Sequence, residues 1–261
     1  MCAAGTQPRR ECRPHRRSRG WPRREPARRL LGVLDRLRPL RDLVWPASCA
    51  ACGVGGQALC PACALDVAGL AQLRAHAPTP SPRGFPPTLT WGDYAGSLRR
   101  LVVAHKDEDR ADAAPLLSAI LGDVVEASLA GLPSPLLVPV PSSASSRRSR
   151  GREPLLDIAA GMSLSVAVPL VNALRVGRPV RDQAGLGHAE RRANLDGSMA
   201  LVPGVEEVLD GADIVLLDDV VTTGSTLAEA ARAVRSGGSG TPRGGVRSVR
   251  AAVICATRRT K

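Results

Sequence analysis

The sequence has 261 residues and a formal net charge of +12, and aromatic residues make up only 2% of it. A chain of this length holds one sizeable domain and a small one, here with a core built mainly from Ala, Val and Leu. No apolar run reaches the roughly 18 residues of a membrane span, and the N-terminus lacks the apolar segment of a secretory signal, so we expect a cytoplasmic protein.

Residues 1–40 are predicted to form a disordered tail rich in Arg and Pro. Residues 1–30 hold ten Arg and two Glu, a net charge of +8, which leaves +4 for the rest of the chain. Without apolar periodicity this segment does not build a core. This segment could make weak, non-specific contacts with nucleic acid or another polyanion. The alternatives are a solvated segment without a function, or a start codon assigned upstream of the true one.

A small metal module is expected at residues 41–76. Its four cysteines, Cys49, Cys52, Cys60 and Cys63, form two Cys-x2-Cys pairs separated by seven residues. Four thiolates at this spacing close a tetrahedral zinc site with no open position, which indicates a structural role. A redox Cys-x-x-Cys motif is the alternative interpretation. The central loop is too short for a DNA-reading helix.

A Pro-rich linker is expected at 77–87 and an α/β domain at 88–261. The expected strands are 91–94, 136–141, 166–171, 214–217 and 249–254, and the expected helices are 96–105, 113–129, 155–162 and 227–234. Because strands and helices alternate along the chain, we expect a doubly wound parallel sheet.

The most specific motif follows the apolar strand 214–217. Asp218 and Asp219 come next, at the carboxyl end of the strand, where open α/β sheets bind their ligands. The following loop offers hydroxyls, backbone N–H groups and a glycine at a helix N-terminus, which suits a phosphate. Its residues are Val221, Thr222, Thr223, Gly224, Ser225 and Thr226.

The two carboxylates would repel a phosphate, so they need another task. Accepting hydrogen bonds from the vicinal hydroxyls of a sugar, with a bound Mg²⁺ softening the repulsion, fits both acids. The motif therefore predicts a pocket for ribose 5-phosphate. The simpler alternative is a strand, a turn with capping hydroxyls and a helix in an ordinary α/β domain.

The segment 214–226 resembles the phosphoribosyl-pyrophosphate (PRPP) loop of the type I phosphoribosyltransferases. The resemblance implies that fold, with a small zinc-ribbon-like module at the N-terminus. It also implies that Asp218 and Asp219 hold the ribose 2- and 3-hydroxyls and that residues 221–226 cradle the 5-phosphate. The implied cofactors are Mg²⁺, bound with PRPP, and a structural Zn²⁺.

Over roughly residues 40–261 the order of motifs resembles the ComF family. The four-Cys knuckle, a segment 94–106 ending in Lys106, a Val-Pro-Val-Pro strand with an Arg-rich loop, and Gln183 followed by Arg191-x-x-Asn194 precede the PRPP loop. Members of that family in naturally transformable bacteria are linked to competence and DNA uptake. The chain departs from the family at 150–154, where Arg-Gly-Arg-Glu-Pro stands, so the family's polar contacts there do not carry over.

A phosphoribosyl transfer releases pyrophosphate, whose charge needs cations and hydroxyls. The loop after the strand 136–141 and the internal lysine are the candidates, with a solvated basic loop and a surface lysine as the alternatives. The candidate pyrophosphate contacts are Ser142, Ser143, Arg147, Arg148, Arg150 and Lys106.

Three functions remain open at this point. The chain transfers phosphoribose from PRPP to an unidentified nitrogen acceptor, or it senses PRPP or serves as a scaffold that acts through partners in DNA uptake or recombination. The third is a nucleic-acid-binding module that uses the knuckle and the basic tail. No Ser-His-Asp or Cys-His set indicates hydrolysis.

Overall fold

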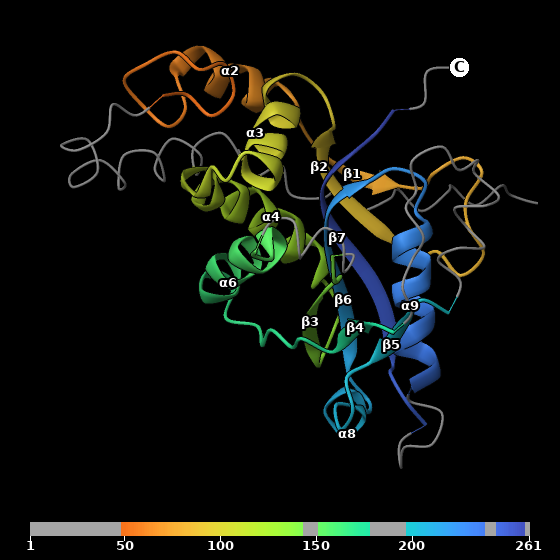
Figure 1. The fold of residues 1–261 in the computed structure, drawn as a ribbon. Coiled ribbons are helices and arrows are strands. Elements are labelled where there is room, and N and C mark those ends of the chain that lie inside the picture. The colour runs from red at the N-terminus through yellow and green to blue at the C-terminus, as the bar shows by residue number, and fades with distance from the viewer. Residues whose placement is uncertain (1–47, 143–150, 178–196, 238–243, 259–261) are drawn as a thin grey trace, which may run out of the picture.

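A five-stranded sheet lies at the centre of the computed structural model, which describes residues 48–142, 151–177, 197–237 and 244–258 (Figure 1). The strand order is β1-β2-β7-β6-β3, and every neighbouring pair is parallel except β1 with β2. The strands are β1 (Ala71–His76), β2 (Thr88–Asp93), β3 (Pro135–Pro139), β6 (Asp213–Val221) and β7 (Ser248–Ala256).

The two long strands at the middle of the sheet are apolar on both faces. Residues 214–217 of β6 and 251–254 of β7 are fully buried, with 0% of each residue exposed. Near-continuous Val, Ile, Leu and Ala are typical of a parallel strand covered on both sides. Because β6 and β7 pair in parallel, their carboxyl ends lie at the same end of the sheet.

Helices cover both faces of the sheet. Figure 1 shows α3 (Gly96–Asp107), α4 (Ala114–Ser128) and α6 (Pro154–Val166) on one side and α9 (Ser225–Gly237) on the other. Two buried clusters match these two layers, one around α4 and one around α9. The predicted doubly wound α/β fold is therefore confirmed. The remaining elements are η1 (Ala111–Ala113), β4 (Leu174–Val176), β5 (Met199–Leu201) and α8 (Glu206–Leu209), with β4 and β5 forming a separate antiparallel pair.

The cysteine-containing segment is joined to the rest of the protein through α3. Helix α2 (Pro61–Gly69) begins directly after Cys60, and its Asp66 carboxylate accepts a 2.8 Å hydrogen bond from the Ser97 backbone N–H. Ser97 lies in the first turn of α3, where backbone donors lack helical partners. Asp66 therefore caps α3 from a neighbouring element.

Strand β1 lies within the range expected for the metal module, and it pairs with β2 at the edge of the main sheet. The sequence patterns do not predict this strand, and they do not predict β4 or β5, each of three residues.

The strand expected at 166–171 is absent, and this prediction was wrong. Helix α6 continues to Val166, and Ala167 ends it in a left-handed conformation with φ of +53°. Leu170 then makes a single parallel bridge to Leu137. Pro169 lacks a backbone donor, which limits ladder formation at this position.

The expected tail at 1–40 lies outside the described residues. Within the described ranges, no helix is long and apolar enough to cross a membrane.

Candidate functional site

Two adjacent acids lie near the carboxyl end of β6, and a lysine from α3 meets them there. Asp218 still pairs in register with Val253 of β7, and the strand extends past the predicted range to Val221. The Lys106 Nζ atom lies 2.6 Å from Asp219 Oδ2. The Asp219 backbone N–H donates a 2.9 Å hydrogen bond to Asp218 Oδ1. The acids therefore share one local network, in which Lys106 is in contact with Asp219.

Electrostatics at this pair favour a proton on one acid. Desolvation, together with the charge of Asp219, raises the pKa of Asp218 to about 8, although Lys106 works in the opposite direction. Behind the pair, the buried Cys255 thiol donates to the Asp219 carbonyl at 3.6 Å, and burial raises the pKa of this thiol. Cys255 is a core residue.

The loop 222–226 turns from β6 into α9. Gly224 has φ of +75°, which side-chain-bearing residues rarely adopt, and a Cβ there would lie 2.7 Å from the Phe85 ring and 2.8 Å from Pro78. The Thr223 hydroxyl donates to Ser225 Oγ at 3.2 Å, and Ser225 begins α9. Glycine is therefore needed at this position for both conformation and space.

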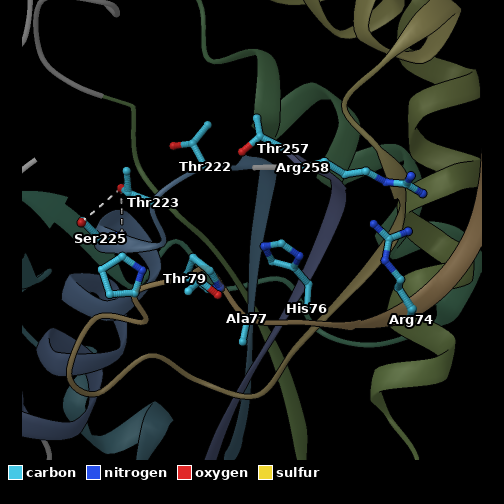
Figure 2. A pocket seen from close by; sticks show the side chains of 11 residues that line it. Arg74, His76, Ala77, Thr79, Thr222, Thr223, Ser225, Thr257 and Arg258 are labelled. Carbon is cyan, nitrogen blue, oxygen red and sulfur yellow. Dashed lines mark hydrogen bonds between the residues drawn. The ribbon is translucent and has the colours of Figure 1, made fainter. Parts of the chain in front are cut away.

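Hydroxyl-bearing residues of this loop line a cavity of about 360 Å³ (Figure 2). Across it lie Arg74 and His76 of β1 and Arg258, which follows β7. The cavity is lined by Arg74, His76, Ala77, Pro78, Thr79, Pro80, Thr222, Thr223, Ser225, Thr257 and Arg258.

Sequence reasoning did not select Arg74, His76 or Arg258. The only signal available was that residues 74 and 76 share one face if this segment is a strand. That strand was itself not predicted.

The candidate pyrophosphate contacts are only partly within the described residues. Ser142 follows β3, is half-buried and lies at the same sheet edge as the acid pair. Lys106 contacts the acid pair. Ser143, Arg147, Arg148 and Arg150 lie outside the described residues, as do Gln183, Arg191 and Asn194.

Arg152, at the departure from the ComF pattern, has a structural role. Its guanidinium Nη1 lies 2.8 Å from Asp157 Oδ2 and its Nε lies 2.7 Å from Asp109 Oδ1. It also donates to the backbone carbonyl of His105, the residue before Lys106. Arg152 therefore links the start of α6 to the last turn of α3.

The four cysteines of the N-terminal segment form one cluster. The Sγ atoms of Cys49, Cys52, Cys60 and Cys63 all lie within 4.8 Å of one another. The Sγ atoms of Cys52 and Cys60 are 3.7 Å apart, close to the roughly 3.8 Å separation expected for a tetrahedron with Zn–S bonds of about 2.3 Å. Burial opposes ionisation of Cys49, but backbone hydrogen bonds from residues 60, 51 and 52 lower its pKa to about 6. The cluster fits a zinc ion.

Comparison with known proteins bears on the C-terminal part of the chain. Residues 160–261 match the phosphoribosyl transferase domain. The matched range begins within α6 and includes the acid pair and the loop 222–226. The match supports a place in the type I phosphoribosyltransferase superfamily for this part of the chain.

Several solved structures match this chain, among them two with low sequence identity. One is the allosteric regulatory enzyme of purine biosynthesis, with 18% identity, 58% of this chain and 30% of that chain covered, and a TM-score of 0.36. The other is adenine phosphoribosyltransferase from Leishmania tarentolae, with 17% identity, 70% of this chain and 84% of that chain covered, and a TM-score of 0.30. Our chain thus spans less than a third of the first protein. No curated protein gives a significant match.

Proposed function

We propose that this protein binds PRPP with Mg²⁺ and transfers its phosphoribosyl group to a nitrogen acceptor. The observation that carries the proposal is the continuous segment from Asp218 to Ser225. It places two carboxylates next to a glycine-containing loop at a helix N-terminus, within the range that matches the phosphoribosyl transferase domain.

Each part of the segment has a role in binding the donor. The carboxylates of Asp218 and Asp219 accept hydrogen bonds from the ribose 2- and 3-hydroxyls. The loop 221–226 binds the 5-phosphate through its backbone N–H groups and through hydroxyls such as that of Thr223. Only three residues connect β6 to α9, so the ribose subsite and the phosphate subsite are held close together.

The reaction is a substitution at C1 of the ribose. The C1–O bond to pyrophosphate breaks, pyrophosphate leaves with the bonding electrons, and a C1–N bond forms as the acceptor nitrogen loses a proton. Lys106 and Ser142 border the position of the leaving group, and Ser143, Arg147, Arg148 and Arg150 complete the proposed pyrophosphate contacts. Mg²⁺ bound with PRPP would neutralise part of the pyrophosphate charge.

The alternative is a protein that binds PRPP without turnover and acts through partners. The motif order resembling the ComF family favours a role in DNA uptake or recombination for that alternative. The structural use of Arg152 at the point of departure from that family also favours it, because a residue engaged with Asp109 and Asp157 is not free to contact substrate.

Calorimetric titration of PRPP with Mg²⁺ tests the binding step. The parent protein is compared with an Asp218→Ala, Asp219→Ala double variant and with a Glu206→Ala, Glu207→Ala control, which removes two adjacent acids from α8. We expect binding by the parent and by the control, and none by the acid-pair variant. Absence of binding by a folded, zinc-loaded parent would refute the proposal.

Pyrophosphate release separates the enzyme from the sensor. PRPP and Mg²⁺ are incubated with a panel of bases and amines, and pyrophosphate is measured. Release that depends on one acceptor and disappears in the acid-pair variant supports transfer. Tight PRPP binding with no release across the panel supports the sensing alternative.

A further inference from the structure

The cavity beside the phosphate loop extends away from the acid pair. Its lining includes Thr222, Thr223 and Ser225 of the loop but neither Asp218 nor Asp219. If the loop binds the 5-phosphate and the acids bind the ribose, then C1 and its leaving group lie on the acid side. The cavity therefore begins at the phosphate end of the ligand, opposite the position where the acceptor attacks.

The far side of the cavity carries an excess of positive charge. Arg258 Nη2 lies 2.6 Å from Asp93 Oδ2, and Arg74 donates to the other oxygen of the same carboxylate. One carboxylate thus serves two guanidinium groups, which leaves a net charge of +1. Arg74 and Arg258 remain 31% and 68% exposed, so both retain donors for a further anion.

A buried histidine atom lies between the two ends. Figure 2 shows the ring of His76 between the two guanidinium groups on one side and Thr223 and Ser225 on the other. Among the described residues, the Nε2 atom of His76 is buried and has no hydrogen-bond partner. Burial, with the charge of Arg74, lowers the pKa of His76, so the neutral ring offers one donor or acceptor there. An unpaired buried polar atom costs free energy unless a ligand or water satisfies it.

The size of the cavity fits more than a single phosphate. Ligand pockets start at about 300 Å³, and this one measures about 360 Å³. The segment 77–80 forms one wall, and its Pro78 lies close to Gly224 of the loop. A phosphate on the loop would fill one end and leave the arginine end available.

We propose that this cavity is a second anion subsite, which accepts a ligand whose ribose 5-phosphate continues into a further phosphate group. This inference rests on the proposed function, because it takes the loop as the 5-phosphate site. The ligand class is a 5-diphosphate or diphosphodiester of ribose, with the first phosphate on the loop and the second between Arg74 and Arg258. The His76 ring contacts the bridging or terminal oxygens.

Calorimetry with two probes tests the subsite. Ribose 5-phosphate occupies the loop alone, whereas ADP-ribose has the same free ribose and 5-phosphate but continues through a diphosphate into adenosine. We expect the parent to bind ADP-ribose at least tenfold more tightly than ribose 5-phosphate. Arg74→Gln and Arg258→Gln should remove most of that preference and leave the affinity for ribose 5-phosphate within about threefold. Arg175→Gln, on the separate strand β4, should change neither affinity.

A further variant tests the subsite without relying on the arginine substitutions, which could misfold the protein. Ala77 lines the cavity, is exposed and carries no charge, so Ala77→Phe fills the subsite without removing an ion pair. It should weaken ADP-ribose binding alone. Equal affinities of the parent for both probes, or a preference that survives both arginine substitutions and Ala77→Phe, would overturn the second subsite. If ribose 5-phosphate and PRPP both fail to bind, the proposed function itself has failed.

Discussion

Lys106 Nζ and Asp219 Oδ2 lie 2.6 Å apart although 113 residues separate them in the chain. The contact joins the last turn of α3 to the end of β6, across the edge where the parallel strands finish. It brings a cation to the acid pair, and it connects α3 to the candidate site. Because Asp66 of α2 caps the other end of α3, the same helix also connects the cysteine cluster to the site.

We predict that Lys106→Met lowers the affinity for PRPP with Mg²⁺ by roughly tenfold, about 1.4 kcal/mol. The variant removes a cation that would face an anionic ligand, and it leaves Asp219 unpaired beside Asp218. Since Lys106 opposes the rise in the pKa of Asp218, the substitution also raises that pKa further. Calorimetry at constant pH measures the loss.

Lys106→Arg is the matched control, since it keeps the charge. It should retain more of the affinity than Lys106→Met, with both proteins folded by circular dichroism. Unchanged binding by Lys106→Met would mean that the lysine only neutralises Asp219 in the free protein.

Gly224→Ala tests whether the loop has the geometry described. The added methyl group would meet the Phe85 ring and Pro78, and it would occupy a backbone conformation with φ of +75°. A positive φ costs a non-glycine residue about 1–2 kcal/mol before any steric contact is counted. We expect a lower Tm and a larger loss of PRPP affinity than the change in Tm alone explains.

The double variant Gly224→Ala, Phe85→Ala separates the two effects. Removing the ring relieves the contact with Phe85 but neither the contact with Pro78 nor the backbone strain, so stability should recover in part. Full recovery would show that φ at this position is not fixed.

Removal of the metal should destabilise helix α3. We predict about one zinc ion per chain by elemental analysis, lost in Cys60→Ser and retained in Cys255→Ala, whose thiol lies outside the cluster. The cluster orders the segment that leads into α2, and α2 supplies the Asp66 cap of α3. Metal loss should therefore lower the Tm. It should also weaken PRPP binding, because α3 carries Lys106 to the acid pair. A metal-free variant with full PRPP affinity would show that the two parts are independent.

The parts of the fold that local sequence patterns determine were predictable. The unbroken apolar run of β6, the acids after it and the hydroxyl-rich turn into α9 lie within 25 residues of one another, and their order alone indicated a strand, a ligand-binding edge and a helix. The spacing of the cysteines likewise predicted a cluster, because each Cys-x2-Cys pair brings two thiols together locally.

The contacts that join distant elements were not predictable in this way. β1 has a mixed burial pattern and contains no β-branched residue, so neither periodicity nor propensity marks it as a strand. Its pairing with β2 is what carries Arg74 and His76 to the cavity. Lys106 was selected as a phosphate contact because it is the internal lysine, and only the tertiary structure shows that it meets Asp219.

The last prediction concerns a buried acid at the amino end of β6, at the end of the sheet opposite the acid pair. Asp213, 1% exposed, accepts hydrogen bonds from Ser248 Oγ at 2.7 Å and from Arg247 Nη1 at 2.9 Å. Burial alone would raise the pKa of this carboxyl, but the hydrogen bonds from Ser248 and the Ser134 backbone, with the charge of Arg247, hold it below the ordinary value.

A carboxyl with a lowered pKa in the folded state binds its proton more weakly than in the unfolded chain. Its stabilisation is therefore complete above the ordinary Asp pKa of about 4, and it is lost as the pH falls through the lower pKa of the folded state. Asp213→Asn keeps the shape but not the charge, so it should cost about 2 kcal/mol at pH 7. Urea unfolding of parent and variant at pH 7 and pH 3 should show this gap narrowing in acid, because only the parent loses the charged interaction. A gap of the same size at both pH values would mean that the pKa of Asp213 is the same in the folded protein and in the unfolded chain.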